Sequence, residues 1–181
     1  MYNWIVIAFF LALILFILVS IILWSLRNGI SPMPTSHKAK CCLLSVLPKM
    51  VNGKVYELGS GWGTLLFPIA RHYPGRQIVG YETSLLPYWF SRMRRKLGGY
   101  PNVEILRKDF FEVAMGDAGL VVCYLYPGAM RRLKDKLRVE LPPDAWVVSN
   151  TFSVPGWPAS RVCEVGDIYY SKVYVYRLNS L

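Results

Sequence analysis

An apolar strand that runs into alternating glycines most restricts how this chain can fold. Residues 54–58 have the pattern of a buried strand, and Gly59, Gly61 and Gly63 follow it. Glycines at the start of a helix bring bare backbone N–H groups close to a ligand. The next predicted strand ends in Glu82, whose carboxylate can accept two hydrogen bonds from a ribose diol. The sequence therefore predicts the nucleoside-binding half of an α/β domain.

The residues around the turn also restrict which nucleoside-containing ligands can bind there. A dinucleotide fingerprint needs a third glycine where Thr64 stands, and a phosphate-binding P-loop needs Gly-Lys-Ser/Thr. Glu57, at the end of the first strand, would repel a pyrophosphate and attract a cationic group. Glu57 and Glu82 together favour a ligand with a ribose, a positive amino group and no phosphate, which describes S-adenosylmethionine. The alternative is a turn whose glycines serve packing alone.

The acid–glycine string with Glu82 resembles the cofactor half of the class I S-adenosylmethionine-dependent methyltransferases, over about residues 40–150. The resemblance implies a doubly wound, mostly parallel α/β sheet of the Rossmann-like methyltransferase type, with S-adenosyl-L-methionine as the cofactor. The alternation of strand and helix patterns along the chain agrees with that fold class. The predicted cofactor-binding residues are Glu57, Gly59, Ser60, Gly61, Gly63, Glu82, Asp109 and Phe110.

Asp109 and Phe110 belong to this set because they follow the third predicted strand, 103–106. An acid at this strand end can accept a hydrogen bond from the adenine amino group, and the aromatic ring can stack on the base. Asp109 can instead cap the turn that follows it. The sequence leaves both roles open.

Three short stretches carry a narrower resemblance: residues 29–35, Tyr124-Leu125-Tyr126-Pro127, and residues 149–152. With the hydrophobic N-terminal segment, they are similar to the small membrane-associated protein-lysine methyltransferases that modify the ATP synthase c-subunit or adenine nucleotide translocase. The resemblance implies lysine N-methylation of a protein in or near a membrane. The stretch at 124–127 departs from the Asp/Asn-Pro-Pro-Tyr of nucleic-acid amino methylases, so nucleic acid is an unlikely partner.

Methyl transfer from a sulfonium needs alignment and a deprotonated acceptor, and proximity alone supplies about 7–11 kcal/mol of barrier reduction. We therefore expect no catalytic triad. The predicted catalytic residues are Tyr124, Tyr126 and Pro127. The two tyrosines and residues 150–152 could line an aromatic channel that lowers the pKa of an amine. The alternative is that both tyrosines are ordinary core or rim aromatics. Two further alternatives are a methyltransferase for a lipid or quinone and a non-catalytic nucleoside-binding module.

The N-terminal segment 4–26 contains no charged residue and as a helix would span roughly 34 Å, enough for a hydrocarbon core of about 30 Å. It lacks the basic start of a signal peptide and the amphipathic pattern of a mitochondrial presequence. We predict a transmembrane anchor at 1–27, a linker at 28–36 and a methyltransferase domain at 37–181. The cations all follow the segment, which predicts a single-pass membrane protein with a cytoplasmic catalytic domain.

The chain is strongly basic, with 21 Lys and Arg against 11 Asp and Glu and a formal net charge of +10. The densest runs lie at 92–96 and 131–138. They are either solvated helix faces or surfaces for an anionic partner. Because the domain is predicted to follow a membrane anchor, we favour the headgroups of the lipid bilayer as that partner.

The four cysteines show no zinc-ligand spacing and are predicted to be reduced thiols. In the tail from 162 to 178, apolar and polar residues alternate, which predicts two antiparallel strands joined by a turn at 166–167.

Overall fold

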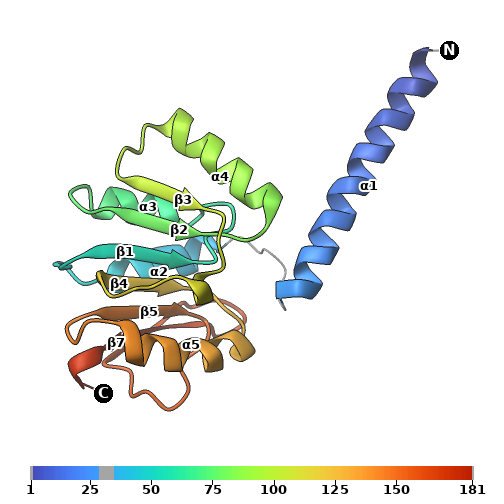
Figure 1. Cartoon of the computed structure of the whole chain (residues 1–181). Helices are drawn as coiled ribbons and strands as arrows, with labels where there is room; N and C mark the ends of the chain where they lie inside the picture. The colour runs from blue at the N-terminus through green and yellow to red at the C-terminus, as the bar shows by residue number, and fades with distance from the viewer. Residues whose placement is uncertain (1, 29–34, 181) are drawn as a thin grey trace. The chain divides into compact units, whose positions relative to one another are not determined.

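The computed structural model describes residues 2–28 and 35–180, and the chain divides into two compact units, Met1–Met33 and Pro34–Leu181 (Figure 1). Each unit is described by itself. Residues 29–34 make up most of the predicted linker 28–36 and of the quoted stretch 29–35, and they lie outside the described residues.

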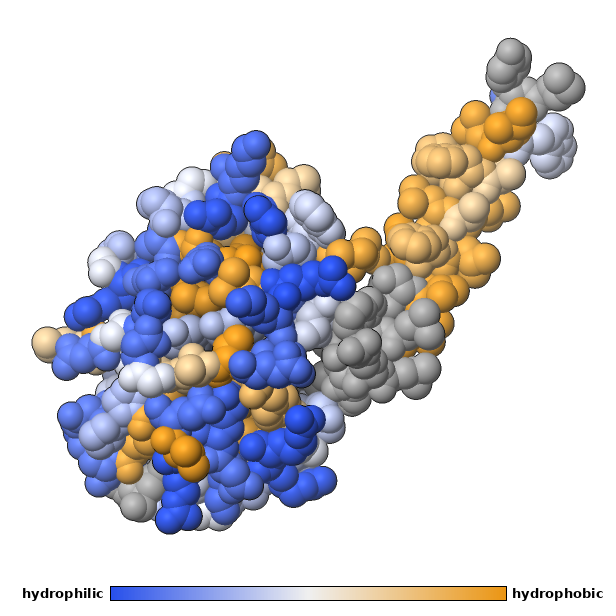
Figure 2. Space-filling view, in the orientation of Figure 1, coloured by the Kyte–Doolittle hydropathy of each residue, from blue (hydrophilic) through white to orange (hydrophobic). Residues whose placement is uncertain are grey.

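The first unit contains helix α1 (Tyr2–Asn28), and the part of this helix that Figure 2 colours is predominantly hydrophobic. Within the described part of the chain, no helix is long and apolar enough to cross a membrane. The predicted transmembrane helix at 1–27 is therefore unsupported, and the predicted single-pass membrane localisation with a cytoplasmic catalytic domain is contradicted.

The second unit is built on one seven-stranded sheet in the order β3-β2-β1-β4-β5-β7-β6. The first five strands are parallel, and β7 is antiparallel to β5 and β6. This order confirms the predicted doubly wound, mostly parallel sheet, with its switch point between β1 and β4. The strands are β1 (Lys54–Leu58), β2 (Ile78–Tyr81), β3 (Val103–Leu106), β4 (Ala118–Cys123), β5 (Trp146–Asn150), β6 (Arg161–Glu164) and β7 (Lys172–Arg177).

Helices cover both faces of the sheet, so the central strands are buried on both sides (Figure 1). Successive residues of β4 alternate between two core clusters: Leu120 packs with α2 and α3, and Val121 with α5. The α-helices of this unit are α2 (His37–Val46), α3 (Leu66–His72), α4 (Leu85–Gly98) and α5 (Pro127–Glu140); short 3₁₀ turns are η1 (Phe110–Glu112) and η2 (Leu178–Ser180).

Helix α2 begins with a side-chain cap, and the predicted hairpin is observed. The Ser36 side chain accepts a hydrogen bond from the Ala39 N–H at 3.2 Å and so caps α2. β6 and β7 pair as an antiparallel hairpin, and Gly166 in their connection has a φ of 66°. The left-handed backbone at this position favours glycine.

The cysteine prediction is wrong for two of the four thiols. A disulfide joins Cys42 of α2 to Cys163 of β6, across a sequence separation of 121 residues. Their Cα atoms are 6.5 Å apart, a separation that only the tertiary fold creates. Cys41 is a free exposed thiol, and Cys123 is free and buried.

Candidate functional site

The glycine turn joins the carboxyl ends of β1 and β2. The N–H groups of Gly59 and Ser60 both donate to the Tyr81 carbonyl at 2.9 Å, and the Gly63 N–H donates to the Ser60 carbonyl at 2.8 Å. Gly59, Gly61 and Gly63 have φ values of 74°, 51° and 73°. Because this backbone region disfavours residues with a Cβ, the turn needs its glycines.

Glu82 is held in place by two backbone donors. The Gly61 N–H donates to Oε2 at 2.7 Å, and the Ser84 N–H donates to Oε1 at 2.6 Å. The Glu82 side chain is buried, yet a carboxylate offers about four acceptor sites. The carboxylate is therefore fixed at the end of β2 with capacity left for two ligand hydroxyls.

Glu57 is the buried acid of the turn. It lies in β1 between Gly80 of β2 and Val122 of β4, and it is 4% exposed. Burial, and to a lesser extent the nearby charge of Glu82, raise the pKa of the Glu57 carboxyl well above its usual value. Among the described residues, Glu57 Oε2 and Ser60 Oγ are buried with no hydrogen-bond partner. Buried polar atoms without partners are rare, and a ligand that fills the crevice would supply the missing contacts.

The glycines have different physical roles. A Cβ on Gly63 would come within 2.5 Å of the Phe67 ring. At this position, glycine is therefore required by tight packing. A Cβ on Gly61 would stand 4.0 Å from Glu82 Oε2, in the space beside that carboxylate. The turn thus combines tight packing under Gly63 with open space at Gly61, as a nucleoside cradle requires.

The third strand places Asp109 and Phe110 at the same edge. The Glu82 N–H donates to the Leu106 carbonyl at 3.1 Å, which ties the ends of β2 and β3 together. The Asp109 side chain accepts from the Phe111 N–H at 2.9 Å, so it caps η1. Phe110 is half-buried and packs against Phe111, with ring centroids 4.5 Å apart. The capping role of Asp109 is observed, and adenine contact by Asp109 and Phe110 stays a prediction.

The three predicted catalytic residues have different surroundings. Tyr124 follows β4 and stacks on Phe152, which follows β5, with ring centroids 6.4 Å apart and planes 19° apart. Tyr126 precedes α5, and its ring leaves no room for a side chain on Gly128, where a Cβ would lie 2.5 Å away. Pro127 is the exposed first residue of α5. The structure brings Tyr124 together with the end of β5, while Tyr126 packs on the core as a rim aromatic.

A strained residue at the end of β5 was not predicted. Thr151 has a φ of 68°, which is unusual for a β-branched residue. Its N–H donates to the Lys172 carbonyl at 2.8 Å, and its hydroxyl lies 3.5 Å from Oδ1 of the buried Asn150. Residues in strained backbone cluster at functional sites. Sequence reasoning missed it because threonine gives no signal for a left-handed backbone.

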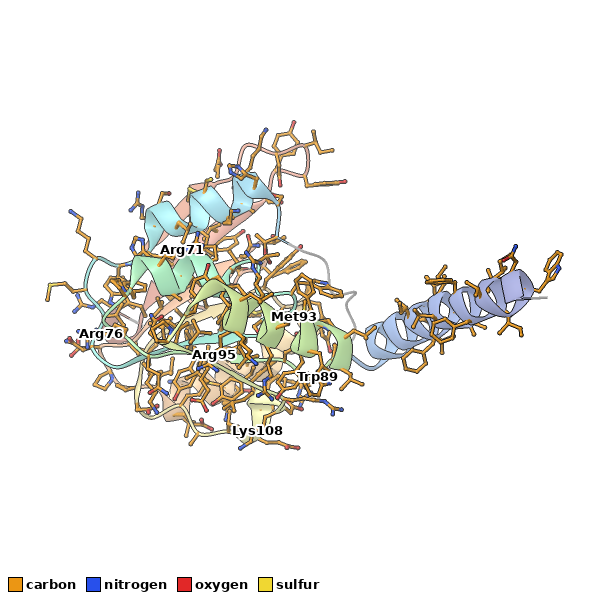
Figure 3. All side chains as sticks on the ribbon, turned by 90° about the horizontal axis from the view of Figure 1, so that it is seen from above. Arg71, Arg76, Trp89, Met93, Arg95 and Lys108 are labelled. Atoms are coloured by element: carbon orange, nitrogen blue, oxygen red, sulfur yellow. A yellow bond between two sulfur atoms is a disulfide. The ribbon has the colours of Figure 1, made fainter. Side chains whose placement is uncertain are left out.

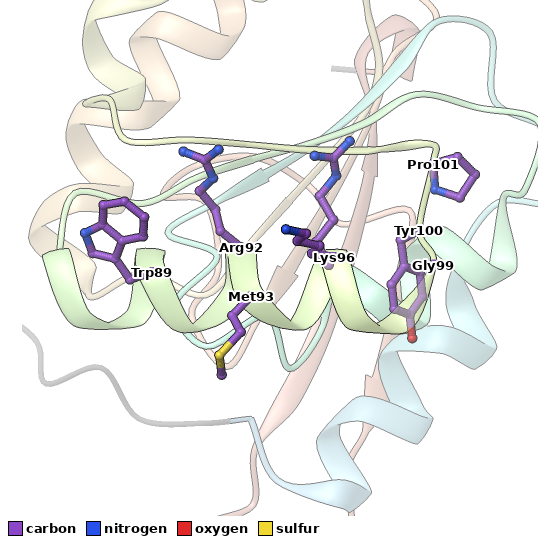
Figure 4. Close-up of a pocket in the computed structure, with 8 residues that line it drawn as sticks. Trp89, Arg92, Met93, Lys96, Gly99, Tyr100 and Pro101 are labelled. Carbon is purple, nitrogen blue, oxygen red and sulfur yellow. The ribbon is translucent and has the colours of Figure 1, made fainter.

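A hollow with a volume of about 610 Å³ lies along α4 and the turn that follows it (Figure 4). Figure 3 shows Trp89, Met93 and Arg95 along this helix. The turn ends at Asn102, whose carbonyl accepts from the Ile78 N–H at the start of β2. One end of the hollow therefore lies at the amino edge of the sheet. Its other end, at Trp89, lies near the start of α4, where the neighbouring Phe90 packs on Trp62 of the glycine turn with ring centroids 5.4 Å apart. It is lined by Trp89, Arg92, Met93, Arg95, Lys96, Gly99, Tyr100 and Pro101.

A doubly wound sheet with an acid–glycine turn after β1 and a fixed acid after β2 defines a Rossmann-like, S-adenosylmethionine-dependent methyltransferase. The buried Glu57 and Ser60 atoms without partners, and the open space at Gly61, fit that cofactor. The family described as ANTKMT methyltransferase domain matches residues 57–161, and this chain belongs to that family.

Relatives of known activity agree with the family. A protein-lysine N-methyltransferase of Saccharolobus islandicus is 30% identical over 74% of this chain and 84% of its own. The adenine nucleotide translocase lysine N-methyltransferase of Mus musculus is 36% identical over 64% of this chain. The chain spans only about half of the mouse protein, at 51% of its length, and 48% of the lysine N-methyltransferase that acts on the c-subunit of ATP synthase in Homo sapiens.

Solved structures agree on the fold. An RNA methyltransferase from Salinibacter ruber in complex with S-adenosyl-L-homocysteine superposes with a TM-score of 0.71 and 28% identity, over 81% of this chain and 94% of that one. A precorrin-6y C5,15-methyltransferase from Geobacter metallireducens shares the fold, with a TM-score of 0.62 and 13% identity over 78% of this chain and 86% of that one. The chain is an S-adenosylmethionine-dependent methyltransferase.

Proposed function

We propose that this chain methylates the side-chain amine of a lysine in a protein, and that residues 37–181 form the methyltransferase domain. One observation supports the proposal most: the stacked pair Tyr124 and Phe152 lies at the same edge of the sheet as Glu57 and Glu82. In doubly wound sheets, ligands bind beyond the carboxyl ends of the strands. An aromatic wall beside the cofactor crevice suits an amine acceptor.

The two acids of the site would hold different parts of the cofactor. Glu82, oriented by Gly61 and Ser84, is placed to accept hydrogen bonds from the ribose diol. Glu57 would hold the positively charged amino acid part, because an anion in a buried site stabilises a cation. The bound cofactor supplies an activated methyl group on a positively charged sulfur. The protein has then to align the acceptor and to keep its nitrogen unprotonated.

The aromatic pair supplies the second requirement. A lysine amine that lies against these rings loses water, and desolvation disfavours its charged form and lowers its pKa. The faces of Tyr124 and Phe152 also attract a methylated ammonium once it has formed. We assign the acceptor wall to this pair first, because the stacking of Tyr124 on Phe152 joins the ends of β4 and β5.

RNA is the second candidate acceptor, since the solved structure at 28% identity is that of an RNA methyltransferase. The hollow along α4 supports this alternative, because it combines Trp89 with Arg92, Arg95 and Lys96. We favour a protein acceptor, because the relatives of known activity that the chain matches are protein-lysine N-methyltransferases. Contact of this basic surface with the headgroups of a lipid bilayer stays a prediction.

The test is to incubate the full chain with tritiated S-adenosylmethionine and total cell extract, and to separate protein, RNA and lipid. We expect label in protein that appears as methyllysine after acid hydrolysis. The Glu82→Ala variant serves as the control and should reduce the label strongly. Label confined to RNA or to the lipid extract would assign a different acceptor. If the chain binds the cofactor but transfers no methyl group to any fraction, it is a non-catalytic nucleoside-binding module.

A further inference from the structure

The connection between β6 and β7 carries three consecutive large side chains in water. Ile168, Tyr169 and Tyr170 are 83%, 80% and 86% exposed, among the highest values for large hydrophobic residues. Single exposed apolar residues are common, but a contiguous group on an ordered loop marks an interaction site. Tyrosine is also enriched among the residues that dominate binding energy at interfaces.

The loop is held in this shape by its own hydrogen bonds. Asp167 Oδ1 accepts from the Tyr169 N–H at 3.2 Å and from the Ser171 N–H at 2.9 Å. The Val165 N–H donates to the Ser171 carbonyl at 2.9 Å and closes the base of the loop. Tyr170 has a φ of 52°, a backbone conformation that costs a non-glycine residue energy. The loop therefore presents its apolar side chains in a defined arrangement.

The loop belongs to the edge of the sheet where the acceptor must arrive. β7 is antiparallel to β5, so β7 begins where β5 ends, and Asn150 pairs with Val173. The Thr151 N–H donates to the Lys172 carbonyl at 2.8 Å, directly after the loop. On the other side, Lys38 Nζ donates to the Gly166 carbonyl at 3.0 Å. The loop therefore lies next to the strand end that carries Phe152.

We propose that the loop 167–171 docks the acceptor protein through an apolar segment that neighbours the target lysine. The inference rests on the proposed function, because the acceptor is the macromolecule that must approach this edge at every turnover. Ile168, Tyr169 and Tyr170 carry no charge and bind an apolar stretch. The chain carries a net charge of +10, which repels lysine-rich tails and favours an acceptor with a neutral or acidic surface.

The test uses three synthetic peptides with one lysine each, flanked by leucine and phenylalanine, by serine and glycine, or by arginine. Methylation kinetics are measured for the wild type and for the double variant Ile168→Ser with Tyr169→Ser. We expect the wild type to prefer the apolar peptide about tenfold in kcat/KM. The double variant should raise KM for that peptide about tenfold, which is about 1.4 kcal/mol, with kcat nearly unchanged.

Leu97→Ser is the matched control, since Leu97 is as exposed as Tyr169 and lies on α4. It should leave both constants unchanged, and all variants should keep wild-type affinity for S-adenosylhomocysteine in calorimetry. Equal use of the three peptides by the wild type, or equal effects of the loop and control variants, would overturn the docking inference alone. Failure to methylate any peptide or any extract protein, with cofactor binding intact, would overturn the proposed function as well.

Discussion

The backbone N–H of Gly61 donates to Oε2 of Glu82 at 2.7 Å and ties the turn after β1 to the acid that ends β2. One carboxylate thereby orders the turn and keeps acceptor capacity for a ligand. Such a double role means that loss of Glu82 acts on both the fold and the site. The two effects separate when stability and affinity are measured on the same variant.

We expect Glu82→Ala to weaken S-adenosylhomocysteine binding by about 100-fold or more, since two hydrogen bonds to a charged group contribute about 1.5–3 kcal/mol each. The melting temperature should fall too, because the Gly61 and Ser84 N–H groups lose their acceptor. Titration calorimetry and thermal denaturation measure both. Glu104→Ala, an exposed acid of β3, is the control and should change neither. Unchanged affinity in Glu82→Ala would remove this residue from the cofactor site.

Cofactor affinity should depend on pH through Glu57. Because its pKa is raised, Glu57 keeps its proton to a higher pH in the free protein than an ordinary glutamate does, and an arriving cation favours the ionised form. Binding should therefore release a proton, and affinity should rise with pH until Glu57 is fully ionised. Calorimetry in buffers of different ionisation enthalpy detects the proton. The Glu57→Gln variant should bind more weakly and without this pH dependence.

The same carboxyl should lower the stability of the free protein at neutral pH. The folded pKa lies above the reference value of 4.5, so the folded state binds more protons than the unfolded state between the two values. The contribution of Glu57 to stability is fully present below pH 4.5 and is lost as pH rises through the folded pKa. We expect Glu57→Gln to raise the free energy of unfolding at pH 7, measured by urea denaturation without cofactor. A decrease would contradict a raised folded pKa.

The sequence predicted the fold well because strand and turn signals are local. The apolar run before Gly59 and the alternation before Gly166 depend on neighbouring residues alone, and both elements were found. The pairing of Cys42 with Cys163 could not be predicted, since only the packing of α2 on the β6 edge brings them together. The predicted N-terminal span rested on the length and hydrophobicity of one segment and on the charges that follow it, and no described helix meets the requirement for a span.

Thr151 offers a test of stored backbone strain. A left-handed conformation costs a β-branched residue of the order of 1–3 kcal/mol, and asparagine tolerates it better. We expect Thr151→Asn to raise the free energy of unfolding by about 1 kcal/mol in urea denaturation. Thr151→Val keeps the branched Cβ and removes the hydroxyl, so it should give no gain. Destabilisation by both variants to the same degree would show that the Thr151 hydroxyl matters more than the strain.

The disulfide closes a loop across a separation of 121 residues, so it restricts the unfolded chain strongly. We expect Cys163→Ser to lower the free energy of unfolding by about 2–4 kcal/mol under oxidising conditions, and to have no such effect in excess reductant. Cys41→Ser is the control, because that thiol is exposed and takes no part in the disulfide, and it should leave stability unchanged.

Burial raises the pKa of the Cys123 thiol to about 11, so this residue should resist alkylation in the native state. Iodoacetamide without reductant should therefore label Cys41 alone, and labelling of Cys163 under these conditions would mean that the bond is absent in solution.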